Sequence, residues 1–158
     1  MPLPPFQAAL DEHRDAVARF IVASVGRQEA DDCLQETLLS ALRAYPRLRP
    51  GSNVRAWLLT IARNKAMDSH RARRRQPVPV GAAPDDAGTS GGNGHVDEPD
   101  AELWKAVRDL PPKQRAAVVL RFVNDLSHRE IATVLDCSEA AARRSLHEGL
   151  VKLREEWT

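Results

Sequence analysis

Aromatic residues and cysteines are scarce in this sequence, and each shortage excludes a class of structure. Aromatic residues make up 4% of the 158 positions, whereas apolar residues make up 42%. A core built mainly from alanine and leucine favours helices over β-sheets rich in aromatic and β-branched residues. The two cysteines, Cys33 and Cys137, form no CxxC pair and have no histidine at ligand spacing. We therefore expect an all-α protein without a zinc site or disulfides, whose cysteines are buried structural thiols or, alternatively, redox sensors.

Long hydrophobic runs and catalytic residue patterns are also absent. No apolar run reaches the roughly 18 residues that a membrane-spanning helix needs, and residues 1–10 lack the features of a signal peptide. The five histidines are scattered, and no glycine-rich phosphate loop follows a predicted strand. We expect a protein of the cytoplasm that does not insert into membranes, is not an enzyme and binds no cofactor or metal.

The positive charge is concentrated in one segment, although the formal net charge is only +1. Residues 47–75 contain nine basic residues and one acidic residue, which gives +8, whereas residues 76–100 contain five acidic residues and no lysine or arginine. Clustered basic side chains release the counterions that are condensed on a nucleic-acid backbone, which favours binding. The charge distribution therefore predicts a nucleic acid as partner.

Residues 76–98 divide the chain into two parts. Proline, glycine and small polar residues follow one another there without periodicity, and such a segment buries too little apolar surface to become ordered. We interpret it as a flexible acidic linker between a domain at 1–75 and a domain at 99–158. Its acids would also attract the arginines just before it and cover a DNA-binding face, but a solvated tether is the simpler interpretation.

Three amphipathic helices are predicted before the linker. Apolar residues recur at helical spacing over 6–25, and Gly26 is a C-terminal stop signal. A second helix is predicted over 29–46, and a third runs from the turn at 50–53 into the arginines at 71–75. The third is apolar on one face and cationic on the other. The expected apolar stripe of the second helix comprises Leu34, Leu38, Leu39 and Leu42.

A helix-turn-helix is predicted after the linker. Two short helices around 103–110 and 116–123 precede it, and Ser127-His-Arg-Glu130 fits the capping box that begins a helix. That helix breaks at 136–138 and is followed by one over about 139–155. Small residues at the predicted crossing of the two helices allow close packing. These residues are Ala132 and Ala142.

Two separate sets of motifs resemble one protein family. The string Leu110-Pro-Pro-Lys-Gln-Arg115, followed by Leu126-Ser-His-Arg-Glu-Ile-Ala132 and Arg143-Arg-Ser-Leu-His147, resembles region 4 of the extracytoplasmic-function (ECF) sigma factors of bacterial RNA polymerase. The string Asp31-Asp32-Cys-Leu-Gln35-Glu36-Thr-Leu38, with Asn53-Val-Arg-Ala-Trp57 to Arg63-Asn64, resembles region 2. The resemblance implies two small helical domains, a three-helix region 2 and a four-helix region 4 with the helix-turn-helix.

The resemblance also implies a function, partners and site residues. Such a protein binds core RNA polymerase, directs it to specific promoter DNA and helps open the duplex, often under the control of an anti-sigma factor. The polymerase-binding residues would be Asp31, Asp32, Gln35 and Glu36. Minus-10 DNA would be bound by Arg49, Ser52, Asn53, Arg55, Arg63, Asn64, Lys65, Asp68, Arg71, Arg74 and Arg75. Minus-35 DNA would be bound by Ser127, Ser138, Arg143, Arg144 and His147.

Some assignments keep alternatives. The acids of the second helix would also suit a solvated helix start, Asp68 would read a base or brace an arginine, and Trp57 is expected to be buried rather than to stack on a base. Glu148 and Gly149 depart from the family's basic pattern, which predicts a weaker grip on phosphates. The rival functions are a sigma-like protein that sequesters an anti-sigma factor without binding DNA, and an ordinary helix-turn-helix repressor.

Overall fold

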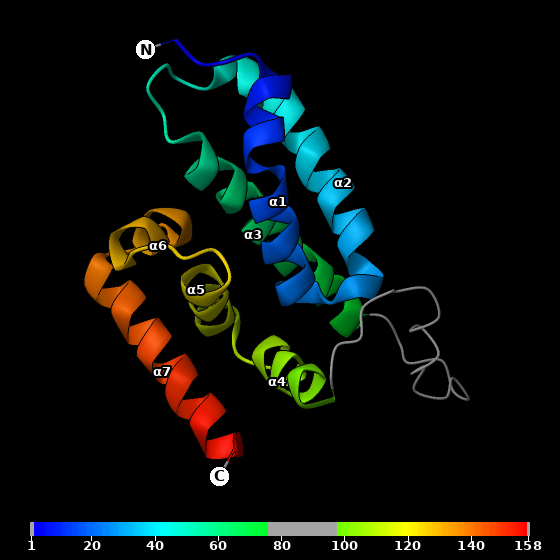
Figure 1. Ribbon diagram of the computed structural model, residues 1–158, viewed down its shortest axis with the longest axis vertical. Coiled ribbons are helices and arrows are strands. Elements are labelled where there is room, and N and C mark those ends of the chain that lie inside the picture. Colours follow the sequence, from blue (N-terminus) through cyan, green and yellow to red (C-terminus); the bar gives the residue numbers. More distant parts are fainter. Residues whose placement is uncertain (1, 76–97, 158) are drawn as a thin grey trace.

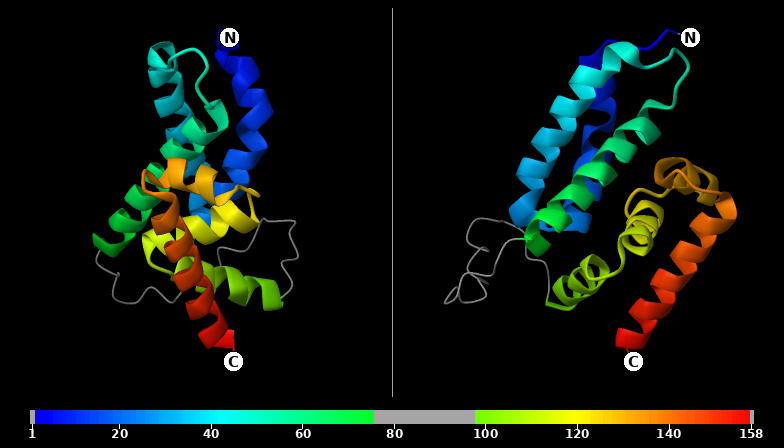
Figure 2. Two further views of the ribbon diagram at one scale, coloured as in Figure 1. Left: turned by 90° about the vertical axis from the view of Figure 1, so that its left-hand side faces the viewer. Right: turned by 180° about the vertical axis from the view of Figure 1, so that it is seen from behind.

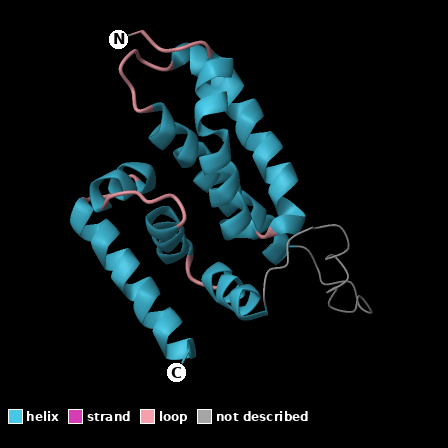
Figure 3. Cartoon of the chain, in the orientation of Figure 1, coloured by secondary structure: helices cyan, strands magenta, loops and turns pink. Residues whose placement is uncertain are grey.

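The computed structural model describes residues 2–75 and 98–157, and every regular element in these two ranges is helical (Figure 3). The expectation of an all-α protein is confirmed. Residues 76–97, which make up nearly all of the predicted linker, lie outside the described residues. The described helices form two groups, α1 to α3 before this gap and α4 to α7 after it (Figure 1).

Helices α1, α2 and α3 pack against one another as a three-helix bundle (Figure 1). Their bounds are Phe6–Val25 for α1, Arg27–Ala44 for α2 and Val54–Arg75 for α3. Gly26 separates α1 from α2 with a φ of 86°, a conformation that glycine adopts without a Cβ clash. A 3-10 turn at Tyr45–Arg47 follows α2, and the Asn53 side chain then caps α3 by accepting a hydrogen bond from the Ala56 amide at 3.1 Å. The predicted stop and cap signals therefore lie where the helices end and begin.

Helix α2 buries only part of the face that the sequence analysis expected, because Leu34 packs against the core but Leu39 and Leu42 do not. Its buried residues are Ala30, Cys33, Thr37 and Ala41. Leu39 and Leu42, which were assigned to the apolar stripe, are each 52% exposed. The assignment was wrong because small side chains let α2 approach α1 and α3 closely, which leaves the longer leucines on the outside.

Helices α4 to α7 form the second group. Their bounds are Glu98–Arg108, Pro112–Phe122, His128–Leu135 and Glu139–Trp157. The predicted capping box is confirmed, because the Ser127 hydroxyl accepts from the Glu130 amide while the Glu130 carboxylate accepts from the Ser127 amide, both at 3.2 Å. Asp136 ends α6 with a φ of 54°, and the turn to α7 follows. Ala142 is fully buried, as expected for a close crossing of α6 and α7.

The two groups share one continuous hydrophobic core. Phe20, Ile21 and Leu59 anchor it in the first group, and Leu120 and Ile131 anchor it in the second. Helix α6 packs on α3, and α4 and α5 pack on α1, as the view from behind shows (Figure 2). The helix-turn-helix therefore rests directly on the helix that carries the cationic face.

Candidate nucleic-acid interface

One face of α2 combines acidic and apolar side chains in a continuous exposed strip. Asp31, Asp32, Gln35 and Glu36 are all exposed, as are Leu39 and Leu42. Spacings of three and four residues place these side chains on the same side of the helix. The structure thus brings together the four polar residues that the sequence assigned to polymerase binding, and it adds two leucines that were missed. The sequence indication for their exposure is the row of small residues on the opposite face of α2, which a search for leucine periodicity overlooks.

The outward face of α3 is polar and largely open. Asn64, Asp68 and Arg71 are exposed, and Lys65 is half-buried. Among the side chains that the structure describes, no arginine forms an ion pair with Asp68. Its carboxylate is exposed on the surface, one helical turn from Asn64. Trp57 is half-buried against the core and its ring lies 6.0 Å from that of Tyr45, as the expectation of burial required. The side chains of Arg74 and Arg75 lie outside the described residues.

Two arginines of α3 face the second helical group instead of solvent. The Arg55 guanidinium donates a hydrogen bond to the backbone carbonyl of Asn124, in the loop between α5 and α6. Burial lowers the pKa of Arg63, while nearby Cys137 and Asp136 at the α6–α7 turn act in the opposite direction. The sequence assigned both arginines to minus-10 DNA, but in this arrangement the helix-turn-helix covers them.

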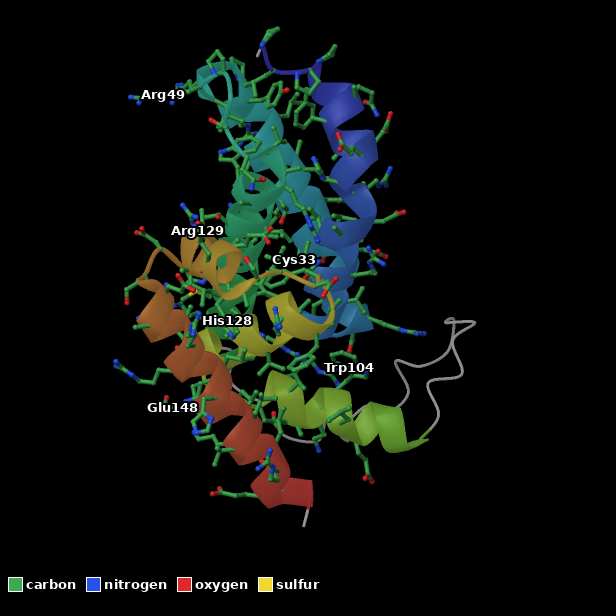
Figure 4. The ribbon with its side chains drawn as sticks, turned by 60° about the vertical axis from the view of Figure 1, so that its left-hand side comes forward. Cys33, Arg49, Trp104, His128, Arg129 and Glu148 are labelled. Atoms are coloured by element: carbon green, nitrogen blue, oxygen red, sulfur yellow. The ribbon has the colours of Figure 1, made fainter. Side chains whose placement is uncertain are left out.

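The loop before α3 is organised by local hydrogen bonds. The Ser52 hydroxyl donates to the Arg49 carbonyl at 2.6 Å, and Asn53 caps α3 through its Oδ1 atom. Figure 4 shows the Arg49 side chain pointing away from the body of the molecule. Of the three loop residues assigned to DNA, Arg49 is thus the one whose side chain extends freely into solvent.

A further arginine of α3, which the sequence analysis did not assign, is tied to α2. The Arg73 guanidinium lies 3.3 Å from the Glu29 carboxylate, which also accepts a hydrogen bond from the Ser69 hydroxyl at 2.9 Å. These contacts join the C-terminal half of α3 to the first turn of α2. Arg73 therefore positions the cationic helix, and its charge is partly balanced within the bundle.

The exposed face of α7 is the second candidate DNA surface. Arg143, Arg144 and His147 are all exposed, and Arg143 pairs with Glu139 one turn earlier at 2.8 Å. The Ser138 hydroxyl caps α7 by accepting from the Ala141 amide at 3.1 Å. Ser127, which the sequence assigned to DNA, forms the capping box at the start of α6, the helix that precedes α7.

Arg129, near the start of α6, is exposed and was missed by the sequence analysis (Figure 4). In a helix-turn-helix, the first helix crosses the DNA backbone while the second enters the groove. Arg129 is the second residue of α6, so its positive charge lies in the first turn of the helix that would cross the DNA backbone.

Gly149 has a packing reason that the sequence analysis did not recognise. It lies buried where α7 crosses α5, and a Cβ atom there would come within 2.9 Å of Val118 Cγ2. The Gln114 Cβ and carbonyl oxygen would each lie 3.4 Å from it. The glycine therefore allows close helix packing. Because it is buried against α5, it does not belong to the face of α7 that would contact phosphates.

The two cysteines differ in their surroundings. Cys33 is buried in the first bundle, and burial together with nearby Glu36 raises its pKa to about 11. Cys137 is half-buried at the α6–α7 turn. In the described ranges no group of three or more histidine, cysteine and acidic residues is placed to hold a metal ion. Of the helices in those ranges, none is long and apolar enough to cross a membrane.

Residues 9–76 match the family model described as Sigma-70 region 2, and residues 100–153 match the one described as Sigma-70, region 4. The chain is 34% identical to the RNA polymerase sigma factor CarQ of Myxococcus xanthus, over 95% of this chain and 87% of CarQ. It is 33% identical to the ECF RNA polymerase sigma factor SigD of Mycobacterium tuberculosis, over 93% of this chain and 74% of SigD.

Two solved structures share the fold. The sigma factor RpoE of Bartonella quintana, in complex with the anti-sigma factor NepR, superposes with a TM-score of 0.71 at 24% identity, over 95% of this chain and 94% of RpoE. CnrH, in complex with the cytosolic domain of CnrY, superposes with a TM-score of 0.72 at 23% identity, over 96% of this chain and 86% of CnrH.

Proposed function

This chain belongs to the ECF sigma factors of the sigma-70 family, and we propose how its surfaces divide the work of promoter recognition. It is an alternative sigma factor, which binds core RNA polymerase, directs it to specific promoters and helps open the DNA. The family is not a class of enzymes. We place its action in the cytoplasm, where the polymerase works, and propose an anti-sigma factor as a further partner, as RpoE has in its complex.

Core polymerase is proposed to bind the exposed strip of α2. Asp31, Asp32, Gln35 and Glu36 supply charge and hydrogen-bonding groups, and Leu39 and Leu42 supply apolar area that is already free of the core. Half-exposed leucines beside acids suit a protein interface with an apolar centre and a polar rim. The exposure of Leu39 and Leu42 beside the acids of the same helix is the observation that carries the assignment.

Minus-10 DNA is proposed to bind along α3 and the loop before it. Asn64 and Asp68 are exposed and have groups that can pair with base edges, while Lys65, Arg71 and Arg49 are placed for phosphates. The hydrogen bonds of Ser52 and Asn53 fix the conformation of the loop, which is proposed to bind a DNA base flipped out of the stack. Arg55, Arg63, Arg74 and Arg75 complete the proposed set, and the first two become available only when the helix-turn-helix moves away.

Minus-35 DNA is proposed to bind the N-terminal half of α7 in the major groove. Arg144 and His147 are exposed there, and Arg143 is held by Glu139. Arg129 on α6 is proposed to contact the adjacent phosphates, with Ser138 and Ser127 fixing the two helix starts. Because Arg143 is paired within its own helix, Arg144 is expected to contribute most to base recognition.

Run-off transcription with core polymerase and genomic promoter fragments tests the division of labour. Asp32→Arg should weaken core binding at least tenfold, because it reverses a charge in the α2 strip, while Glu12→Arg at an exposed position of α1 serves as control. Arg144→Ala should weaken minus-35 use by about 1 to 3 kcal/mol and leave core binding intact, with Lys152→Ala as control on the same helix. Equal loss of core binding in both variants would refute the assignment.

A further inference from the structure

The loop between α5 and α6 inserts a buried amide into the first helical group. Asn124, in this loop, is 2% exposed, and its Nδ2 atom donates a hydrogen bond to the backbone carbonyl of Ala16 in α1 at 2.9 Å. Figure 1 shows the loop reaching from α5 toward α1 and α3. Buried polar groups are normally hydrogen-bonded; here the Nδ2 group has its partner in the other domain, whereas the buried Oδ1 atom has no hydrogen-bond partner among the described residues.

The backbone of the same residue engages the helix that carries the cationic face. The carbonyl of Asn124 accepts the hydrogen bond from Arg55, so a single loop residue joins α1 and α3 of one domain to the helix-turn-helix of the other. Farther along α3, Arg63 lies beside Asp136 and Cys137, where burial lowers its pKa. Two of the arginines proposed for minus-10 DNA, Arg55 and Arg63, therefore lie against region 4.

We propose that Asn124 is an interdomain latch, which keeps the free protein closed and withholds Arg55 and Arg63 from promoter DNA until the two domains separate. This inference rests on the proposed DNA-binding role of α3. The latch adds one side-chain hydrogen bond and one hydrogen bond to a backbone carbonyl to the apolar contacts that already join the two groups. It sets a conformational cost on DNA binding without preventing it.

The physical consequence is a competition between the latch and the DNA. A ligand that binds only the open form has an apparent affinity reduced by the fraction of molecules that are open. Removing one buried hydrogen bond and leaving its partner unsatisfied shifts such an equilibrium by about five- to tenfold. A latch variant should therefore open more often and bind core polymerase and promoter more tightly, although no residue that touches DNA has changed.

The native thiols of the full-length free protein report on opening. Cys137 lies near Arg63 at the junction of the domains, whereas Cys33 is buried inside the first bundle. The test compares alkylation of the two thiols, resolved by peptide mass spectrometry, in the wild type, Asn124→Ala and the near-isosteric Asn124→Asp. Gln7→Ala, which removes an exposed amide from α1, is the matched control.

Opening predicts a specific pattern of alkylation. Cys137 should react about five- to tenfold faster in both Asn124 variants than in the wild type and Gln7→Ala, with Cys33 unchanged, and small-angle scattering should give a larger radius of gyration. Far-ultraviolet circular dichroism checks that helical content is retained. Unchanged Cys137 reactivity and radius in a folded Asn124→Asp variant would overturn the latch, and equal acceleration of Cys33 would assign the effect to unfolding. These readouts need no polymerase, so they stand apart from the test of sigma activity.

Discussion

Replacing Gly149 with alanine tests whether the α5–α7 crossing requires the absence of a side chain. At an exposed position inside a helix, alanine stabilises relative to glycine by about 0.8 to 1.0 kcal/mol. At Gly149 the new Cβ would lie 2.9 Å from Val118 Cγ2 and 3.4 Å from the Gln114 carbonyl oxygen. Valine is restricted to one rotamer in a helix, so Val118 cannot turn its methyl away at low cost. Either the helices move apart or the contact stays strained.

The magnitude follows from these opposing effects. Overpacking in a well-packed core costs about 1 to 3 kcal/mol, which exceeds the gain in helix propensity. We therefore expect Gly149→Ala to lower the free energy of unfolding by about 1 kcal/mol. For a chain of 150 to 250 residues, this corresponds to a fall in Tm of roughly 2–4 °C. Urea and thermal unfolding followed by circular dichroism measure both quantities.

A double-mutant cycle separates the contact from other effects. Val118→Ala removes the methyl that the new Cβ would meet and, by itself, should cost about 1.5 kcal/mol for two lost methyl groups. In the double variant the alanine at 149 occupies part of the vacated space, so the two changes should offset each other by about 1 to 2 kcal/mol. A Gly149→Ala variant that is more stable than the wild type, or an interaction energy below about 0.5 kcal/mol, would refute the reasoning.

Three further predictions follow from local features. Ser127→Ala should destabilise the protein by about 1 kcal/mol, since it removes one half of the capping box, with exposed Thr133→Ala as control in urea unfolding. Leu42→Ser should change stability by less than about 0.5 kcal/mol yet weaken core polymerase binding in a pull-down titration, whereas a core role for this leucine would appear as a large loss of stability. Because the Cys33 pKa of about 11 exceeds that of a free thiol, folding should weaken as the pH rises from about 9 to 11, and a Cys33→Ala variant should lack that loss in a pH series of urea titrations.

The helix boundaries could be predicted from the sequence because each depends on neighbouring residues. Gly26 ends α1, Asn53 begins α3, and Ser127 with Glu130 begins α6, and each signal acts over at most a few positions. The two motif sets likewise predicted the family and its order of regions, which the family comparison confirms. The four acidic and amide residues of α2 could be placed together because one helix carries them all.

The contacts between distant segments could not be predicted in the same way. Leucine spacing predicted Leu34 correctly but Leu39 and Leu42 wrongly, since the packing of small residues against α1 and α3 depends on the neighbouring helices and not on hydrophobicity alone. Asn124 and Arg55 are 69 positions apart, and nothing in either local sequence pattern indicates that they meet. The individual DNA-binding assignments remain predictions, because they depend on a partner that lies outside the protein chain.

The small-residue face of α2 has a consequence for how this protein can change over evolutionary time. Alanine, cysteine and threonine fix the position of α2 in the bundle, while the residues that are proposed to meet the polymerase project from the opposite side. Substitutions on the outer side alter neither the volume nor the shape of the core. Affinity for the polymerase can therefore be tuned, strengthened or lost among related chains while the three-helix bundle keeps the same stability and geometry.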